Sequence, residues 1–136
     1  MGREGVTVFT RALKYRNKEV RLPDGSSHAY LDGDEKGIDV RLAIDVIRLA
    51  HKNEFDVALI FSRDQDLSEV ADEIKAISID QKRWIKVASA YPYGPAVKTF
   101  RGINNTEWIK IDRATYDTCI DKRDYRPKPR VDKPDA

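Results

Sequence analysis

Apolar and polar positions follow two different patterns along this chain, and each pattern predicts a different kind of element. Between residues 37 and 52, apolar side chains recur every three or four positions, which is typical of a helix that buries one face. Residues 55–61 form a short, continuously apolar run, which indicates a central parallel strand covered on both faces. A second helix is expected from Leu67 to about Ile77.

Further strands, turns and loops are expected around these three elements. Short apolar runs predict strands over residues 6–13, 18–22, 84–88 and 108–111. Clusters of Gly, Pro, Asn, Asp and Ser predict a turn over 23–27 and a long loop over 91–105, and a short helix is expected over 113–120. Strands that alternate with helices in this way are typical of a doubly wound α/β domain.

Composition assigns these elements to one domain. A chain of 136 residues that is 40% hydrophobic can bury one core but is too short for two ordinary domains. We expect this domain over residues 1–125 and a basic, Pro-rich, disordered tail over 126–136. The sequence lacks an apolar membrane span and an apolar signal core, and Cys119 is its only cysteine. These features predict a soluble, cytoplasmic protein without a disulfide framework or cysteine metal site.

Charge is distributed unevenly along the chain. Residues 1–80 carry four more acidic than basic side chains, whereas residues 81–136 carry six more basic than acidic ones. This division suits a site where carboxylates hold a metal ion and nearby cations hold an anionic polymer. A basic C-terminal segment that only improves solubility explains the same distribution.

Three carboxylates are expected to converge at one end of the predicted sheet. Asp39 opens the first helix, and Asp64 and Asp66 follow the strand over 55–61. Ligands of open parallel sheets bind beyond the carboxyl ends of the strands, and a right-handed crossover can bring a helix start to that end. Carboxylate clusters suit Mg²⁺ or Mn²⁺, which activate a water molecule and neutralise charge on a leaving oxygen.

Helix capping offers a simpler explanation for each of these acids. Asp66 stands three residues before Glu69, so residues 66–69 fit a capping box. Asp39 fits an ordinary first-turn acid that the helix dipole favours. Asp64 is harder to explain as a cap, because a second acid beside a cap adds repulsion without meeting a further hydrogen-bonding need.

The two acidic segments resemble those of a known family. Residues 35–39 read EKGID, and residues 55–66 read FDVALIFSRDQD. With the apolar pattern between them, they resemble the NYN domain, a PIN-like branch of metal-dependent ribonucleases, over roughly residues 33–91. The resemblance implies a three-layer PIN-like or Rossmannoid α/β fold with a mainly parallel central sheet, an Mg²⁺ or Mn²⁺ site, and RNA as substrate.

The resemblance also implies residue roles. It makes Asp39 and Asp64 metal ligands, Asp66 a ligand directly or through water, Ser62 a hydrogen-bonding support, and Lys36 a phosphate contact. NYN domains open with an apolar strand that ends in a catalytic Asp, usually followed closely by an Asn, and no Asp-x-x-Asn occurs in this sequence. We therefore expect a domain that is incomplete at its N-terminus, without that strand and its acid.

Basic and aromatic residues near strand ends are candidate RNA contacts. Core packing is the favoured role of Trp84 and Trp108, whereas Tyr91 and Tyr93, beside Pro92 and Gly94, are expected to stack on RNA bases. The candidate phosphate contacts are Lys82, Arg83, Lys98 and Arg101, with a solvated surface as the alternative.

These features together favour a divalent-metal ribonuclease that hydrolyses RNA phosphodiester bonds. One alternative is a catalytically inactive RNA-binding or regulatory module of the same fold. Another is a protein whose sheet is completed by a second copy or a different partner chain, because a missing strand leaves an unpaired edge.

Overall fold

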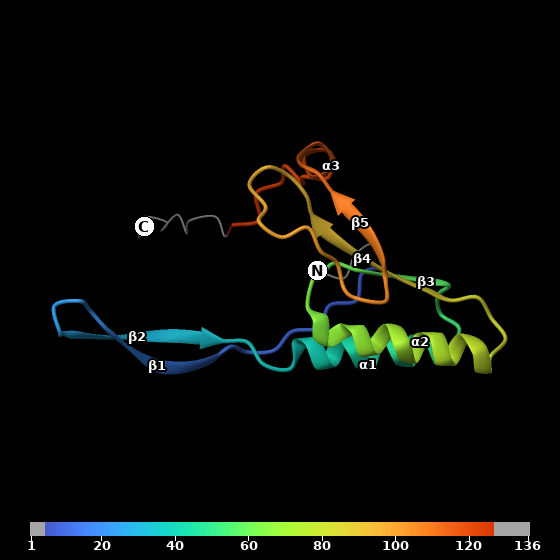
Figure 1. The fold of residues 1–136 in the computed structure, drawn as a ribbon, viewed down its shortest axis with the longest axis horizontal. Coiled ribbons are helices and arrows are strands. Elements are labelled where there is room, and N and C mark those ends of the chain that lie inside the picture. The colour runs from blue at the N-terminus through green and yellow to red at the C-terminus, as the bar shows by residue number, and fades with distance from the viewer. Residues whose placement is uncertain (1–4, 127–136) are drawn as a thin grey trace, which may run out of the picture.

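The computed structural model describes residues 5–126, which form a β-hairpin and an α/β unit (Figure 1). Along the chain the elements are β1 (Lys14–Arg21), β2 (Ser27–Asp34), α1 (Ile38–His51), β3 (Val57–Ile60), the single-turn 3-10 helix η1 (Gln65–Leu67), α2 (Ser68–Asp80), β4 (Lys86–Pro92), β5 (Glu107–Ile111) and α3 (Arg113–Thr118). The predicted tail lies outside the described residues except for Arg126, and the predicted domain bounds stay a prediction. No helix within residues 5–126 is long and apolar enough to cross a membrane.

The α/β unit is built on a parallel sheet with the strand order β3-β4-β5. In its register, Ile60 lies beside Ser89, and Ala90 lies beside Ile109. Because β4 is the central strand and both neighbours run in its direction, the carboxyl ends of all three strands meet at one edge of the unit. The predicted α/β class with a parallel sheet is confirmed.

Helices α1 and α2 pack on one face of this sheet and form the core with it. Buried side chains of both helices contact Ile60 of β3 and Val87 of β4, and Ile74 and Ile77 of α2 are almost completely buried. Figure 1 shows the two helices beneath the strands, where they pack against each other. The apolar periodicity over 37–52 predicted α1 correctly, because its buried stripe faces this core.

The opposite face of the sheet is apolar and largely open. Val57, Leu59 and Phe61 alternate with the core residues of β3, and they are 48%, 47% and 74% exposed. The short helix α3 reaches this face only near the carboxyl ends of the strands, where Tyr116 lines a pocket together with Phe61. The prediction that β3 is covered on both faces is therefore wrong within residues 5–126, although its position is right.

The N-terminal strand predicted over residues 6–13 is absent, and this segment is irregular. Phe9 instead lies under the guanidinium of Arg41 on α1, with 4.5 Å between the guanidinium carbon and the ring centroid. A strand needs a neighbour for its main-chain hydrogen bonds, and none pairs with residues 6–13 in the described part of the chain. An apolar run alone could not reveal this.

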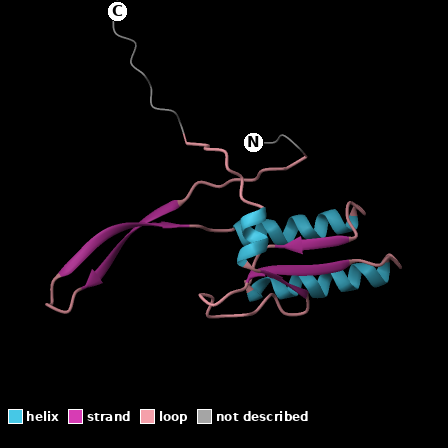
Figure 2. Cartoon of the chain, turned by 90° about the horizontal axis from the view of Figure 1, so that it is seen from above, coloured by secondary structure: helices cyan, strands magenta, loops and turns pink. Residues whose placement is uncertain are grey.

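The segment that follows forms a hairpin that projects away from the α/β unit (Figures 1 and 2). The predicted turn over 23–27 is confirmed: Gly25 adopts a φ of 86°, and the side chain of Asp24 accepts a 2.9 Å hydrogen bond from the backbone N–H of Ser26. β1 is longer than the predicted strand over 18–22, and its partner β2 was not predicted. Almost all hairpin side chains are exposed, so burial leaves little pattern in this stretch of sequence.

The predictions for the two tryptophans require correction. β4 begins at Lys86 rather than at Trp84, and the Trp84 side chain is 64% exposed instead of buried in the core. Trp108 is 45% exposed; its indole N–H donates a 2.7 Å hydrogen bond to the carbonyl of Ile103. The central strand buries Ala88, Ser89 and Ala90 instead, because small side chains fit where β4 is flanked on both sides.

Candidate functional site

The carboxyl end of β3 continues into a short acidic turn, residues 62–66, which is held by its own hydrogen bonds. The hydroxyl of Ser62 accepts a 3.1 Å hydrogen bond from the backbone N–H of Asp64. The Oδ1 atom of Asp64 accepts a 3.0 Å hydrogen bond from the backbone N–H of Asp66. Ser62 therefore accepts a hydrogen bond within the turn, and its supporting role at a metal site stays a prediction.

Asp64, not Asp66, is the helix cap. Asp64 is the N-cap of η1, which begins at Gln65, so the N–H two residues later is that of Asp66. Helix α2 begins at Ser68 and has no side-chain cap, so the predicted capping box over 66–69 does not form. The extra 3-10 turn causes this difference, because it starts the helical hydrogen bonding before α2. Among the described residues, nothing donates a hydrogen bond to Oδ2 of Asp64 or to the carboxylate of Asp66.

Asp39 lies in the first turn of α1, which begins after Gly37 in the left-handed conformation (φ 78°). Because α1 leads back to the start of β3, its first turn lies at the same end of the unit as the acidic turn (Figure 1). Across residues 5–126, however, no three or more His, Cys, Asp or Glu side chains are grouped closely enough to hold a metal ion. The described chain thus joins Asp64 and Asp66 in one turn without the predicted three-carboxylate cluster.

The donor chemistry of the acidic turn still suits a divalent cation. Asp64 and Asp66 are both exposed and offer carboxylate oxygens. Mg²⁺ typically keeps several waters and is bound through one or two protein carboxylates together with substrate phosphates. A pair of exposed carboxylates beside open solvent meets that requirement.

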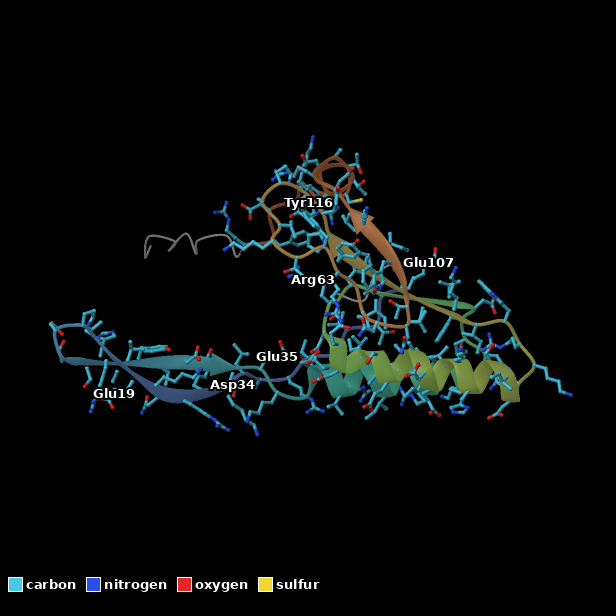
Figure 3. The ribbon with its side chains drawn as sticks, viewed as in Figure 1. Glu19, Asp34, Glu35, Arg63, Glu107 and Tyr116 are labelled. Carbon is cyan, nitrogen blue, oxygen red and sulfur yellow. The ribbon has the colours of Figure 1, made fainter. Side chains whose placement is uncertain are left out.

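Lys36 lies in the exposed segment between β2 and α1. Its Nζ atom is 3.8 Å from Oδ2 of Asp34, and both side chains are at least one-third exposed. Such an exposed ion pair is weak and leaves the ammonium group free to turn toward another anion. Figure 3 labels Asp34 and Glu35 at the base of the hairpin, next to the start of α1.

Gln65 and Arg63 connect the acidic turn to the loop that precedes β5. The amide of Gln65 donates a 2.9 Å hydrogen bond to the carbonyl of Gly102, and its oxygen accepts one of 3.0 Å from the backbone N–H of Asn104. The guanidinium of Arg63 donates a 3.2 Å hydrogen bond to the carbonyl of Thr99. Sequence reasoning missed both residues, and the available signal was their position beside acids at a strand end.

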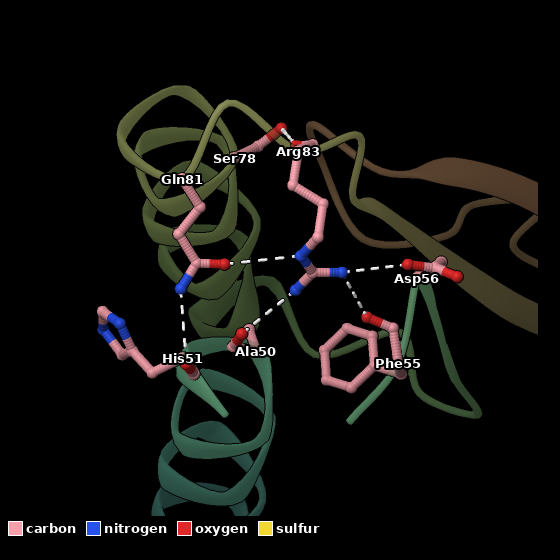
Figure 4. Close-up of polar contacts among 7 residues, drawn as sticks. All are labelled: Ala50, His51, Phe55, Asp56, Ser78, Gln81 and Arg83. Carbon is pink, nitrogen blue, oxygen red and sulfur yellow. Dashed lines mark hydrogen bonds and ion pairs between the residues drawn. The ribbon is translucent and has the colours of Figure 1, made fainter. Parts of the chain in front are cut away.

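The candidate RNA contacts separate onto two ends of the sheet. Lys82 and Arg83 precede β4, so they lie at the amino end, far from the acidic turn. The guanidinium of Arg83 donates hydrogen bonds to the backbone carbonyls of Phe55 (2.7 Å) and Ala50 (3.1 Å) and contacts Asp56, as Figure 4 shows. Arg83 therefore joins α1, β3 and β4, and this structural role argues against the phosphate contact, which stays a prediction.

The other candidates lie toward the carboxyl end. Tyr91 is only 3% exposed and packs edge-on against Trp108, which argues against the predicted stacking on RNA. Tyr93 is 42% exposed, and the ammonium group of Lys110 lies 4.7 Å from its ring centroid. Lys98 is exposed, and the exposed Arg101 donates a 2.9 Å hydrogen bond to the side chain of Asn104.

A cavity of about 960 Å³ opens beside the acidic turn on the open face of the sheet. Its lining is predominantly apolar and comes from the carboxyl ends of β3, β4 and β5, the loop after β4, and α3. The side chains that matter for recognition are Phe61, Arg63, Tyr93, Asp112, Arg113 and Tyr116. Figure 3 labels Arg63 and Tyr116 on this side, away from Glu107 at the start of β5.

Asp112 caps α3 at the rim of this cavity. Its side chain accepts a 2.8 Å hydrogen bond from the backbone N–H of Thr115. Hydrogen bonds from Thr115 lower the pKa of the Asp112 carboxyl below its ordinary value of 3.8. Asp112 is therefore ionised at neutral pH.

Comparison with known proteins identifies the family. The model of the NYN domain matches residues 3–80, which is more than half of the chain and includes both acidic segments. Searches among curated proteins and among solved structures gave no significant match. The parallel sheet with its packed helices agrees with a PIN-like α/β domain. The chain therefore belongs to the NYN domain family, a family of PIN-like nucleases.

Proposed function

We propose that this protein is a divalent-metal-dependent ribonuclease that hydrolyses RNA phosphodiester bonds at the acidic turn. The observation that carries the proposal is the pair of exposed carboxylates, Asp64 and Asp66, fixed in one turn at the carboxyl end of β3. This position is where ligands of open parallel sheets bind. Membership of the NYN family supports RNA as the substrate class.

The residues of the turn would hold the metal ion and keep it in place. Oδ2 of Asp64 and the carboxylate of Asp66 are the proposed ligands. Oδ1 of Asp64 would keep its hydrogen bond from the backbone N–H of Asp66. Gln65 would keep the turn rigid through its two hydrogen bonds to the loop before β5. When bound, Mg²⁺ or Mn²⁺ lowers the pKa of a coordinated water and neutralises charge on the leaving oxygen.

Asp39 and Lys36 have supporting roles in this proposal. Asp39, at the start of α1, would bind the ion through water from the same end of the unit. Lys36 would exchange its exposed contact with Asp34 for a substrate phosphate. The lone Cys119 suits the reducing cytoplasm, where we propose that the protein acts.

The test is cleavage of a labelled single-stranded RNA by the purified chain in Mn²⁺ or Mg²⁺, with an EDTA control. The key variant is Asp64→Asn, because asparagine keeps the acceptor that caps η1 but removes the charge that a metal ion requires. We expect cleavage by the wild type only, and only with metal. Cleavage that persists in EDTA or in Asp64→Asn would overturn the proposal.

A second candidate is a catalytically inactive RNA-binding module of the same fold. The observation that favours it is the lack of a group of three potential metal ligands within residues 5–126. Such a module would bind single-stranded RNA without cutting it in either metal. The cleavage assay, followed by a binding measurement with the same RNA, therefore separates the two functions.

A further inference from the structure

We propose that the cavity beside the acidic turn binds one unpaired RNA base, stacked on Phe61, with Arg63 and Arg113 holding the neighbouring phosphates. This inference rests on the proposed action on RNA and adds the site that would position the strand. For this purpose the cavity is called the base pocket, with Phe61, Arg63, Tyr93, Asp112, Arg113 and Tyr116 as its recognition residues.

The size and lining of the base pocket suit a flat aromatic ligand. Its volume of about 960 Å³ lies at the upper end of the range of roughly 300–1,000 Å³ that small-molecule pockets have. Most of its lining is apolar, with a few charged side chains at the rim. Pockets of this kind bury an apolar ring and orient it through a small number of polar groups.

Phe61 is the most exposed aromatic side chain of the base pocket. It is 74% exposed although it directly follows β3, and it lies next to Ser62 at the start of the acidic turn. Tyr93 and Tyr116 are 42% and 58% exposed on other walls of the same pocket. Exposed aromatic rings that line one cavity provide stacking surfaces for a base, because every base has a π-face.

The charges around the base pocket favour an anionic strand. Arg63 and Arg113 both line it, and the ammonium group of Lys110 lies over the ring of Tyr93. Arg113 is ion-paired with Asp117 at 2.7 Å, but both side chains are exposed, so the pair is weak and a phosphate can replace the carboxylate. Asp112 is the single acid among its recognition residues, and its carboxylate is occupied in capping α3. This excess of positive charge attracts phosphates, whereas an apolar protein segment would gain nothing from it.

The distance to the acidic turn connects base binding to cleavage. Phe61 and Asp64 are three residues apart, so their Cα atoms are separated by at most about 10 Å. A strand whose base enters the base pocket must therefore pass close to Asp64 and Asp66. The base pocket would in this way select an unpaired nucleotide beside the phosphate that is cut.

The inference is tested by RNA binding in EDTA, where no cleavage occurs. Fluorescence anisotropy compares a labelled single-stranded RNA of about ten nucleotides with an abasic RNA of the same length. The proteins compared are the wild type, Phe61→Ala, Phe61→Trp and Trp84→Ala. Trp84→Ala is the control, because Trp84 is a similarly exposed aromatic residue at the opposite end of the sheet. Sedimentation velocity at the same protein concentrations reports self-association.

We expect the wild type to prefer the RNA that carries bases. Phe61→Ala should bind that RNA about 5-fold to 100-fold more weakly, as the loss of one stacked base predicts, while its affinity for abasic RNA stays unchanged. Phe61→Trp should restore the preference, and Trp84→Ala should bind like the wild type. Because Phe61 is mostly exposed, the variants are expected to fold.

Three results with Phe61→Ala would overturn the inference: unchanged binding, an equal loss of affinity for both RNAs, or an effect on self-association alone. The last result would identify a second protein chain as the occupant of the base pocket. A preference for RNA that carries bases over abasic RNA, without metal-dependent cleavage, would support the base pocket and contradict the proposed nuclease activity. Cleavage without base preference would retain the nuclease activity and remove the base pocket.

Discussion

The carboxylate of Asp64 accepts a 3.0 Å hydrogen bond from the backbone N–H of Asp66. This contact makes the two acids parts of one rigid turn, with one oxygen of Asp64 used for structure and the other left for a ligand. Capping and metal binding are therefore compatible roles of Asp64, because they use different oxygens. Substitutions can separate the two roles.

Asp64→Asn and Asp64→Ala should differ in stability but not in cleavage. Asparagine keeps the cap of η1, so the free energy of unfolding should remain close to that of the wild type. Alanine removes the cap and should lower the free energy of unfolding by about 1 kcal/mol. Both variants lack the charge and should lose metal-dependent cleavage. Urea denaturation and the cleavage assay measure the two effects; equal stability of the two variants would show that the hydrogen bond contributes little.

Arg83→Ala should destabilise the protein without a specific effect on RNA. The change removes the side-chain donor to the carbonyl of Phe55 and one of two donors to the carbonyl of Ala50, which also accepts from the backbone N–H of Asn53. The Arg83 side chain is only 22% exposed. We expect the free energy of unfolding to fall by about 2 kcal/mol. The matched control is Lys82→Ala, an exposed neighbour, which should stay within about 0.5 kcal/mol of the wild type. Unchanged stability together with weaker RNA binding would restore the phosphate role of Arg83.

Gly102→Ala should disturb the loop that Gln65 holds. A Cβ atom at this position would lie 2.8 Å from an indole carbon of Trp108 and would also collide with the hydroxyl of Ser89, which is fully buried. We expect a loss of about 1–3 kcal/mol in the free energy of unfolding, measured by urea denaturation. Gly94→Ala is the control, since a Cβ there has no neighbour within 4 Å. Similar effects of the two substitutions would contradict the crowding at Gly102.

Acid should remove the stabilising effect of Asp45. Its hydrogen bond and charge interaction with Arg41, and the charge of Arg48, lower its pKa in the folded protein below the ordinary value of 3.8. The contribution is therefore fully present above about pH 4 and is lost as the pH falls through the lowered pKa. The difference in unfolding free energy between wild type and Asp45→Asn should vanish at low pH and shrink in high salt. A difference that persists in strong acid would contradict this assignment.

The open edge and apolar face of β3 should promote association between chains. Leu59 is 47% exposed on a strand that has a neighbour on one side only within the described chain. We expect sedimentation velocity to show association that increases with protein concentration, and Leu59→Lys to reduce it, because an edge lysine opposes strand pairing. Ile79→Lys is the control, since Ile79 is 70% exposed on α2. A wild type that stays monomeric at all concentrations would contradict the prediction.

Much of the fold could be predicted because its signals are local. The helical periodicity of α1, the apolar run of β3 and the turn at Gly25 each depend on neighbours a few residues away, and the structure confirms all three. β2 escaped prediction because its exposed side chains carry no burial pattern. The irregular residues 6–13 were mistaken for a strand because strand formation depends on a partner that the local sequence does not specify.

The candidate site, like the fold, could be predicted from the sequence only in part. The acidic turn was located from sequence because Ser62, Asp64 and Asp66 follow a strand and are close along the chain. The side-chain roles were harder: Asp64 rather than Asp66 caps the helix, because an extra 3-10 turn precedes α2. Arg83 donates hydrogen bonds to backbone carbonyls, since folding brings the end of α1 and the segment before β3 around it.

The sequence by itself determined the NYN family pattern, the α/β order of elements and the position of the acidic turn, because these depend on residue types and short spacings. Only the tertiary structure decided that Tyr91 is buried, that Gln65 joins the turn to the loop before β5, and that Phe61 faces an open pocket with Arg113 and Tyr116 of α3. The physical reason is that burial, hydrogen bonds and pockets between segments distant in the chain arise from packing.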